Sequence, residues 1–140
     1  MDPSGLITVF VIEDSPAIRE ALMQRIEDDP RFTVCGYADT AAEARVQLGK
    51  LLPDVITLDL HLKQGTGYEI LAHLAQTAKR ADFKIMVLTN YASAAHRRQA
   101  MALGADGFFD KSMQFDEMLD ALHLWADEHY QQRPTIDVPD

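Results

Sequence analysis

The stretch Asp54–Leu60 limits the possible folds more than any other part of the chain, because a short apolar run ends there on a carboxylate. It follows Pro53 and is too short for a helix of its own, so it predicts a strand buried on both faces of a parallel sheet. Asp59 then lies at the carboxyl end of this strand. In open α/β sheets, ligands bind at that edge, in the crevice where the strand order reverses.

A second apolar run, Ile7–Ile12, ends in the same way on Glu13 and Asp14. Two central strands would therefore bring three carboxylates, those of Glu13, Asp14 and Asp59, to one edge of the sheet. Carboxylates this close repel one another, and a bound divalent cation with oxygen ligands relieves the repulsion. We expect Mg²⁺, because it favours oxygen ligands and binds through few carboxylates.

Strand and helix patterns alternate along the whole chain. Besides the two runs above, Phe32–Tyr37, Lys84–Thr89 and Gly107–Phe109 predict strands. Five strands and five helices in alternation predict an α/β fold, a doubly wound parallel sheet. We expect residues 1–130 to form one domain and residues 131–140 to be a tail or linker. The helices, predicted from apolar residues at helical spacing, begin near Pro16, Thr40, Tyr68, Ser93 and Phe115.

The composition argues against several classes of protein. A chain of 140 residues suffices for one domain with its own core, and its net charge of −9 argues against a nucleic-acid surface. The five histidines lack the spacing of a zinc site, and the single Cys35 lies in a predicted strand as an inert thiol.

The amino terminus does not look like a signal peptide, and no stretch of the sequence is long and apolar enough to cross a bilayer. We therefore expect a cytoplasmic protein without membrane contacts.

The residues that follow the predicted strands form one chemical set. Asp59 stands alone in the middle and is the best nucleophile, whereas the adjacent pair Glu13 and Asp14 is better suited to share a cation. Thr89 offers a hydroxyl group and Lys111 a positive charge. Transfer of a phosphoryl group to an aspartate requires such a set, because the metal and the lysine neutralise the phosphoryl oxygens while a carboxylate attacks in line.

This set resembles the site of the receiver domains of bacterial two-component response regulators, and the similarity covers about Leu6 to Tyr130. The resemblance implies a flavodoxin-like fold with the strand order 2-1-3-4-5. The motifs that carry it, in the order and spacing of the family, are Glu13-Asp14, Asp59 after its apolar run, Leu88-Thr89, and Gly104–Lys111.

The resemblance also implies a specific chemistry. Asp59 would be the phosphoacceptor, and a sensor histidine kinase or a phosphotransfer protein would be the donor. Asp14 and Asp59 would bind Mg²⁺ directly, Glu13 would act mostly through water, and the backbone carbonyl of His61 would complete the protein ligands. Such a protein catalyses only its own phosphorylation and dephosphorylation, so it is not an enzyme with a separate substrate.

Members of this family respond to phosphorylation through a hydroxyl shift at the Thr89 position, coupled to the rotation of an aromatic ring at the Phe108 position. This movement would remodel the face formed by the fourth helix, the fifth strand and the fifth helix. A downstream protein partner, or a second copy in a homodimer, would bind there. Phe108 lacks the hydroxyl of the commoner tyrosine, so burial alone should favour its inward state.

The sequence departs from the family pattern near the expected site. Lys63 stands where proline is usual, which leaves the loop after the phosphoacceptor less constrained. Ser112 stands where a cis proline commonly follows the lysine, and a cis bond is costly without proline. Asn90 replaces a small residue and would narrow access to the acyl phosphate. His61 and Tyr91 occupy positions that tune hydrolysis, and we expect them to shield the phosphoryl group and slow dephosphorylation.

Other functions are compatible with parts of this pattern. A pseudo-receiver would keep the fold and bind partners without phosphorylation, which Asn90 and Ser112 would permit. An aspartyl-phosphate hydrolase usually needs a second aspartate shortly after the nucleophile, and residues 61–63 contain none. A flavodoxin-like cofactor binder would need a phosphate-cradling loop where the acidic Glu13-Asp14 pair repels phosphate. The chain is either a single-domain regulator or a fragment whose effector domain followed Asp140.

Overall fold

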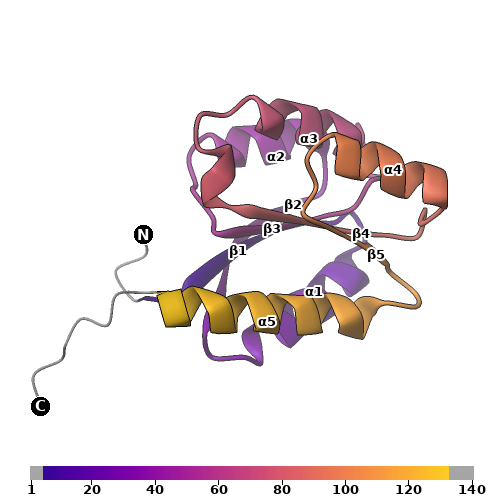
Figure 1. Cartoon of the computed structure of the whole chain (residues 1–140). Coiled ribbons are helices and arrows are strands. Elements are labelled where there is room, and N and C mark those ends of the chain that lie inside the picture. Colours follow the sequence, from indigo (N-terminus) through magenta and orange to yellow (C-terminus); the bar gives the residue numbers. More distant parts are fainter. Residues whose placement is uncertain (1–4, 133–140) are drawn as a thin grey trace, which may run out of the picture.

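The strands of the structure lie where the apolar runs of the sequence predict them. They are β1 (Ile7–Ile12), β2 (Phe32–Ala38), β3 (Val55–Leu58), β4 (Lys84–Thr89) and β5 (Gly107–Asp110). In this computed structural model, which describes residues 5–132, every neighbouring pair of strands is parallel and the order is β2-β1-β3-β4-β5 (Figure 1). This order confirms the doubly wound sheet expected from the sequence.

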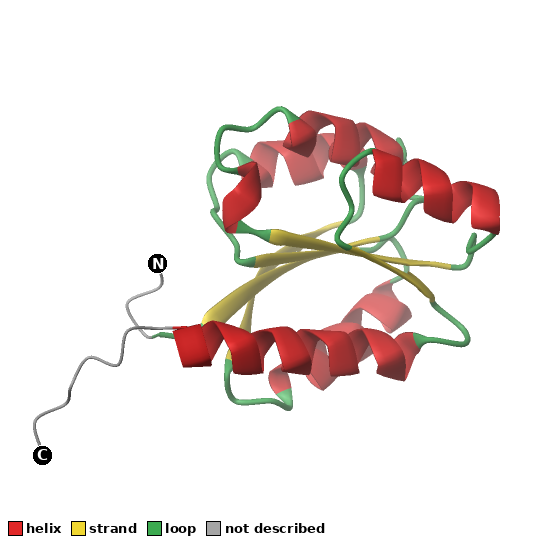
Figure 2. Cartoon of the chain, in the orientation of Figure 1, coloured by secondary structure: helices red, strands yellow, loops and turns green. Residues whose placement is uncertain are grey.

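Five α-helices alternate with the strands (Figure 2). They are α1 (Pro16–Glu27), α2 (Ala41–Leu48), α3 (Gly67–Ala75), α4 (Ala94–Ala102) and α5 (Phe115–Gln132). A short 3-10 helix, η1 (Arg80–Asp82), precedes β4 and has no counterpart in the sequence prediction. Because α5 continues to Gln132, only residues 133–140 of the expected tail follow it, and these lie outside the described residues. No helix within residues 5–132 is long and apolar enough to span a membrane.

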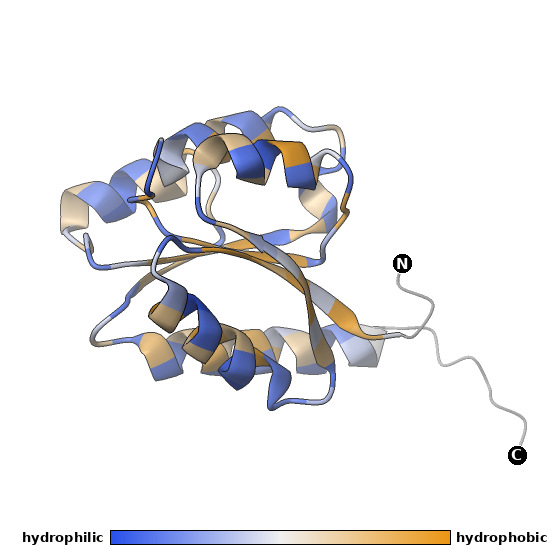
Figure 3. Ribbon diagram, turned by 180° about the vertical axis from the view of Figure 1, so that it is seen from behind, coloured by the Kyte–Doolittle hydropathy of each residue, from blue (hydrophilic) through white to orange (hydrophobic). Residues whose placement is uncertain are grey.

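Each strand directs alternate side chains to opposite faces of the sheet, so the protein has two apolar cores. On β1, Phe10 and Ile12 pack under α2, α3 and α4, whereas Val9 and Val11 pack against α1 and α5. Figure 1 shows these helical layers above and below the sheet, and Figure 3 shows strongly apolar strands between them. Burial on both faces explains why the strands read as continuous apolar runs.

Four helices begin with a hydroxyl side chain that caps the first turn. The side chains of Ser15, Thr40, Thr66 and Ser93 each accept a hydrogen bond from the backbone N–H three residues later, at the starts of α1, α2, α3 and α4. Such caps satisfy N–H groups that have no partner within the helix. Because these helices start at the carboxyl edge of the sheet, the caps also restrain the loops that carry the candidate site residues.

Candidate functional site

Strands β1 and β3 lie side by side in the middle of the sheet, and both end at its carboxyl edge. Ile12 pairs with Leu58, and the N–H of Asp59 donates to the carbonyl of Ile12 at 3.1 Å. Glu13 and Asp59 follow these strands and are 2% and 6% exposed. One carboxylate oxygen from each of Glu13, Asp14 and Asp59 lies within 4.8 Å of the others. The structure therefore brings together the three acids that the sequence places at this edge.

The ammonium group of Lys111 lies between two of these carboxylates. Its Nζ is 2.7 Å from Glu13 Oε1 and 2.8 Å from Asp59 Oδ2. Burial lowers the pKa of Lys111, but hydrogen bonds to Asp59 and Glu13 outweigh this effect and hold the pKa above its usual value. Burial raises the pKa of Glu13, while the hydrogen bond from Lys111 opposes that rise. The lysine is therefore charged at neutral pH.

The charges of this cluster do not cancel. When all three carboxylates are ionised, the single ammonium group leaves two net negative charges in a largely buried place. A divalent cation would cancel them, and carboxylate oxygens this close to one another suit a hard ion such as Mg²⁺. Asp14 is the most exposed of the three acids. The residues present therefore fit the magnesium site that the sequence predicts.

Neighbouring groups hold the two buried carboxylates in place. The N–H of Ser15 donates to Glu13 Oε2 at 3.0 Å, and the N–H of His61 donates to Asp59 Oδ1 at 3.2 Å. Arg19 reaches back from α1 and donates to the carbonyl of Glu13 at 3.0 Å. Each buried carboxylate thus has a backbone partner on one oxygen and the lysine on the other, which restricts its rotation.

Thr89 and Phe108 lie on the adjacent strands β4 and β5. Thr89 is fully buried, and its Oγ1 accepts a hydrogen bond from the N–H of Tyr91 at 3.1 Å. The N–H of Lys111 donates to the carbonyl of Thr89 at 2.9 Å, so the threonine lies next to the charged cluster. Phe108 is 4% exposed, and Arg97 of α4 donates to its carbonyl at 3.2 Å. Phe108 therefore occupies an inward position, in the core under α2, α3 and α4.

The loop between β3 and α3 is restrained even though Lys63 stands where proline is usual. The carbonyl of Gln64 accepts a hydrogen bond at 3.0 Å from the first residue of α2. The N–H of Gly67 donates to the carbonyl of Leu60 at 2.9 Å. A side chain at Gly67 would collide with the carbonyl of Asp59 and lie 2.9 Å from the Cα of Leu60. A glycine is therefore required where α3 begins against the backbone of the site.

His61 and Tyr91 come from the loops after β3 and β4, and their rings stack on each other. The ring centroids are 3.6 Å apart and the ring planes differ by 19°. Tyr91 is 47% exposed, and the His61 side chain is also exposed. The two residues expected to tune hydrolysis are thus in direct contact.

The remaining departures from the family pattern also lie near Lys111. The peptide bond between Lys111 and Ser112 is trans, as are all peptide bonds within residues 5–132. Asn90 is exposed. It borders a hollow of about 300 Å³ beside the lysine, whose other lining residues are Ile18, Ala21, Ser112 and Phe115.

Two residues that support the site could not be recognised from the sequence. Arg19 and Gly67 belong to no motif, because their roles depend on what faces them in the fold. Gly67 was predicted to lie in the loop before the helix that begins near Tyr68, whereas the structure begins α3 at Gly67 itself.

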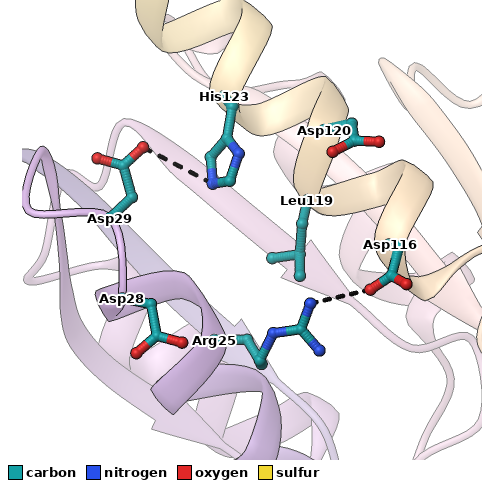
Figure 4. Close-up of a pocket in the computed structure, with 7 residues that line it drawn as sticks. All are labelled: Arg25, Asp28, Asp29, Asp116, Leu119, Asp120 and His123. Atoms are coloured by element: carbon teal, nitrogen blue, oxygen red, sulfur yellow. Dashed lines mark hydrogen bonds and ion pairs between the residues drawn. The ribbon is translucent and has the colours of Figure 1, made fainter.

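A second hollow lies away from the acidic edge, between the end of α1 and α5 (Figure 4). It measures about 590 Å³ and is bordered by an ion pair between Arg25 and Asp116 at 2.9 Å and by a contact of 3.7 Å between His123 Nε2 and Asp29 Oδ2. Leu119 lies between the two pairs. These contacts join α1 and the loop after it to α5, so the residues that border the hollow stabilise the fold.

Comparison with known proteins identifies the family. The family model of the response regulator receiver domain matches residues 9–123. The DNA-binding transcriptional activator DevR/DosR of Mycobacterium tuberculosis is 30% identical over 117 residues, which cover 84% of this chain and 53% of that protein. A protein-glutamate methylesterase/protein-glutamine glutaminase of Saccharophagus degradans is 34% identical over 122 residues, which cover 87% of this chain and 34% of that protein. The chain thus spans between about a third and a half of these relatives.

Solved structures agree with this match. The chain is similar to a LuxR-family two-component response regulator from Aurantimonas sp. SI85-9A1, with a TM-score of 0.79, 26% identity, and coverage of 88% of this chain and 86% of that one. It is also similar to the response regulator domain of CheB from Thermotoga maritima, with a TM-score of 0.74, 27% identity, and coverage of 88% of this chain and 95% of that one. The fold, the sequence match and the solved structures all lead to one conclusion: the chain belongs to the response regulator receiver domain family.

Proposed function

We propose that this protein is a phosphoacceptor switch of a two-component system and that Asp59 is the residue that is phosphorylated. The position of Asp59 carries the proposal. Its carboxylate lies 2.8 Å from Lys111 Nζ and within 4.8 Å of carboxylate oxygens of Glu13 and Asp14, at the carboxyl end of the central strand β3. Membership of the receiver family supports the same function.

The phosphoryl transfer would proceed by in-line attack of an Asp59 carboxylate oxygen on phosphorus. A bond forms from that oxygen to phosphorus, the bond from phosphorus to the donor nitrogen breaks, and its electron pair stays on that nitrogen. Lys111, whose raised pKa keeps it charged, would neutralise a phosphoryl oxygen. The Thr89 hydroxyl accepts from the N–H of Tyr91, so its own proton is available for another phosphoryl oxygen.

The proposed ligands of Mg²⁺ are the residues that the family pattern indicates. Asp14 and Asp59 would bind the ion directly, the backbone carbonyl of His61 would be a third ligand, and Glu13 would act mostly through water. The bound ion would neutralise charge on the phosphoryl oxygens. The short distances among the three carboxylates support this assignment, as does the position of the His61 backbone beside Asp59.

A sensor histidine kinase or a phosphotransfer protein is the proposed donor. The hollow of about 300 Å³ beside Lys111 supports this, because Ile18 and Phe115 offer it an apolar contact surface next to the charged cluster. A donor that packs there would bring its phosphohistidine close to Asp59.

The proposed output is a change in the face formed by α4, β5 and α5, with Thr89 and Phe108 as switch residues. The contacts between Arg97 and Phe108 support this, because the Arg97 guanidinium of α4 donates to the Phe108 carbonyl and lies 5.8 Å from the centre of its ring. A downstream protein or a second copy of the chain would bind the altered face. Analytical ultracentrifugation with and without beryllofluoride would detect a homodimer that depends on phosphorylation.

The acyl phosphate should be hydrolysed slowly, with a lifetime of many minutes. The stacked rings of His61 and Tyr91 support this expectation, because they would hinder the approach of water to the phosphoryl group. The measurement is the decay of phosphorylated protein after the phosphodonor is removed, and a lifetime of seconds would contradict it.

The decisive experiment is incubation with Mg²⁺ and acetyl phosphate, followed by mass spectrometry of the intact protein. The wild type should gain one phosphoryl group, and Asp59→Asn should gain none. Asp82→Asn, which changes an exposed acid in η1 before β4, is the matched control and should behave like the wild type. Uptake that survives in Asp59→Asn would refute the assignment of the nucleophile.

Two alternatives predict other outcomes of this experiment. A pseudo-receiver would take up no phosphoryl group even though it is folded. An aspartyl-phosphate hydrolase would turn over the phosphodonor many times without accumulating the acyl phosphate, and residues 60–67 contain no second aspartate to assist it.

A further inference from the structure

Four ring side chains form a continuous row beside the carboxyl edge of the sheet. His61 stacks on Tyr91, the Tyr91 ring lies 6.1 Å from that of His96, and the His96 ring lies 6.4 Å from that of Tyr68. These side chains come from four segments: the loops after β3 and β4, α4 and α3. Rings attract one another at centroid distances of roughly 4.5–7 Å, so the two contacts of His96, with Tyr91 and with Tyr68, are favourable.

The first two members of the row are bonded to the candidate site through their backbones. The N–H of His61 donates to Asp59 Oδ1 at 3.2 Å, and the N–H of Tyr91 donates to Thr89 Oγ1 at 3.1 Å. The two side chains that would handle the phosphoryl group therefore each have a hydrogen bond from the backbone of a stacked residue.

His96 is the anchored member of the row. Its Nδ1 lies 2.6 Å from Ser93 Oγ, and its backbone N–H donates to the same oxygen at 3.2 Å, at the start of α4. The His96 side chain is half-buried, and Tyr68 on its other side packs against the core. Tyr91, in contrast, is 47% exposed and sits in a loop. A fixed ring next to an exposed one limits the rotamers that the exposed ring can adopt.

We infer that His96 is a positioning residue that holds the Tyr91 ring against His61 and thereby prolongs the lifetime of the acyl phosphate. This inference rests on the proposed function of Asp59 and extends it to a residue of α4. His96 has no role in the transfer itself, because it acts only through Tyr91. Loss of its ring should leave uptake of the phosphoryl group intact and speed the entry of water.

The ring arrangement can be tested in the unphosphorylated protein by NMR. A tyrosine ring stacked on an imidazole moves the imidazole proton signals upfield, so the His61 signals should be shifted in the wild type and normal in Tyr91→Ala. The upfield shift should shrink in His96→Ala and persist in His96→Phe, which keeps a ring at this position. Arg98→Ala, an exposed change on the same helix, is the matched control. A full upfield shift in His96→Ala would overturn the inference.

The second readout is the lifetime of the acyl phosphate after acetyl phosphate is removed. Loss of one ring contact should shorten the lifetime in His96→Ala by about 2- to 10-fold, and His96→Phe should restore it. Thermal unfolding of each variant checks that the fold is retained. An unchanged lifetime in His96→Ala, or a shortened one that phenylalanine does not restore, contradicts the inference. If the wild type takes up no phosphoryl group, the proposed function itself is wrong, while the NMR shifts still decide whether His96 positions Tyr91.

Discussion

Lys111 has two opposite effects on the charged cluster. Its ammonium group bridges Glu13 and Asp59 and so reduces the repulsion between them. The same positive charge repels a divalent cation that approaches these carboxylates. In the proposed function, the lysine would therefore weaken cation binding while it prepares the site for the negative charge of a phosphoryl group.

Replacement of Lys111 by methionine leaves an unbranched side chain that is one atom shorter and carries no charge. We expect the affinity of Lys111→Met for Mg²⁺ at neutral pH to rise by about tenfold, because a nearby positive charge is lost. Isothermal titration calorimetry at constant ionic strength would measure the change. Lys84→Met makes the same change at the start of β4, at the opposite edge of the sheet, and should leave the affinity unaltered. If Lys111→Met and Lys84→Met bound Mg²⁺ with the same affinity, Lys111 would not act on the cation site.

Thr57 is a buried polar residue in the middle of β3. Its Oγ1 has no hydrogen-bond partner among the described residues. Thr57→Val keeps the shape and removes the hydroxyl, so it should raise the free energy of unfolding by about 1 kcal/mol in urea denaturation. Thr8 is the contrasting case, because its Oγ1 both donates to and accepts from Asp54 at 3.1 Å. Thr8→Val should lower the free energy of unfolding by about 1–2 kcal/mol. A loss of stability in Thr57→Val would show that this hydroxyl does have a partner.

Among the elements, the start of α3 has the strictest steric requirement near the site. Gly67→Ala would press a methyl group against the carbonyl of Asp59, which must then shift together with its carboxylate. We expect this change to lower the free energy of unfolding by about 2–3 kcal/mol. It should also weaken the binding of beryllofluoride, measured by fluorescence or calorimetry.

A second glycine provides the control for this prediction. At Gly49, which caps the end of α2, an added Cβ would meet its nearest neighbour at 3.4 Å, an ordinary contact. Gly49→Ala should therefore change the free energy of unfolding by less than about 1 kcal/mol. If Gly67→Ala were tolerated equally well, α3 would not need its close approach to Asp59.

On the scale of the whole molecule, ion pairs between distant segments connect the last helix to the first third of the chain. Arg31 pairs with Asp29 at 2.8 Å and also with Asp127 of α5. His123 of α5 lies 3.7 Å from the same Asp29 carboxylate. Together these contacts hold α5 beside the loop that follows α1.

This arrangement predicts how stability depends on pH. Hydrogen bonds from Arg31 hold the pKa of Asp29 below its usual value. The ionised Asp29 carboxylate therefore contributes its full stabilisation above about pH 4, the pKa of an aspartate in the unfolded chain. This contribution is lost as the pH falls through the lower pKa that Asp29 has in the folded protein. Asp29→Asn should reduce the free energy of unfolding by roughly 0.5–1 kcal/mol near neutral pH, and the difference from the wild type should vanish in acid. Denaturation from about pH 3 to pH 7 measures this, with the exposed neighbour changed in Asp28→Asn as the control. A difference that is constant over this range would contradict the prediction.

The sequence by itself determined the order of the elements, the doubly wound sheet, the family and the carboxylates at its edge. Apolar runs such as Ile7–Ile12 must lie between two layers of helices, and the carboxyl ends of parallel strands must meet at one edge. Glu13, Asp14 and Asp59 are therefore brought together by the strands that they follow. These features depend on periodicity and on chain order, and both can be read along the sequence.

Only the tertiary structure decided how the side chains and loops at that edge meet. The bridging position of Lys111 and the row of rings through His96 join segments that are far apart in the chain, and the close approach at Gly67 depends on how the loop after β3 folds back on Asp59. Such contacts depend on the directions of side chains and on distances between loops, which leave no periodic pattern in the sequence.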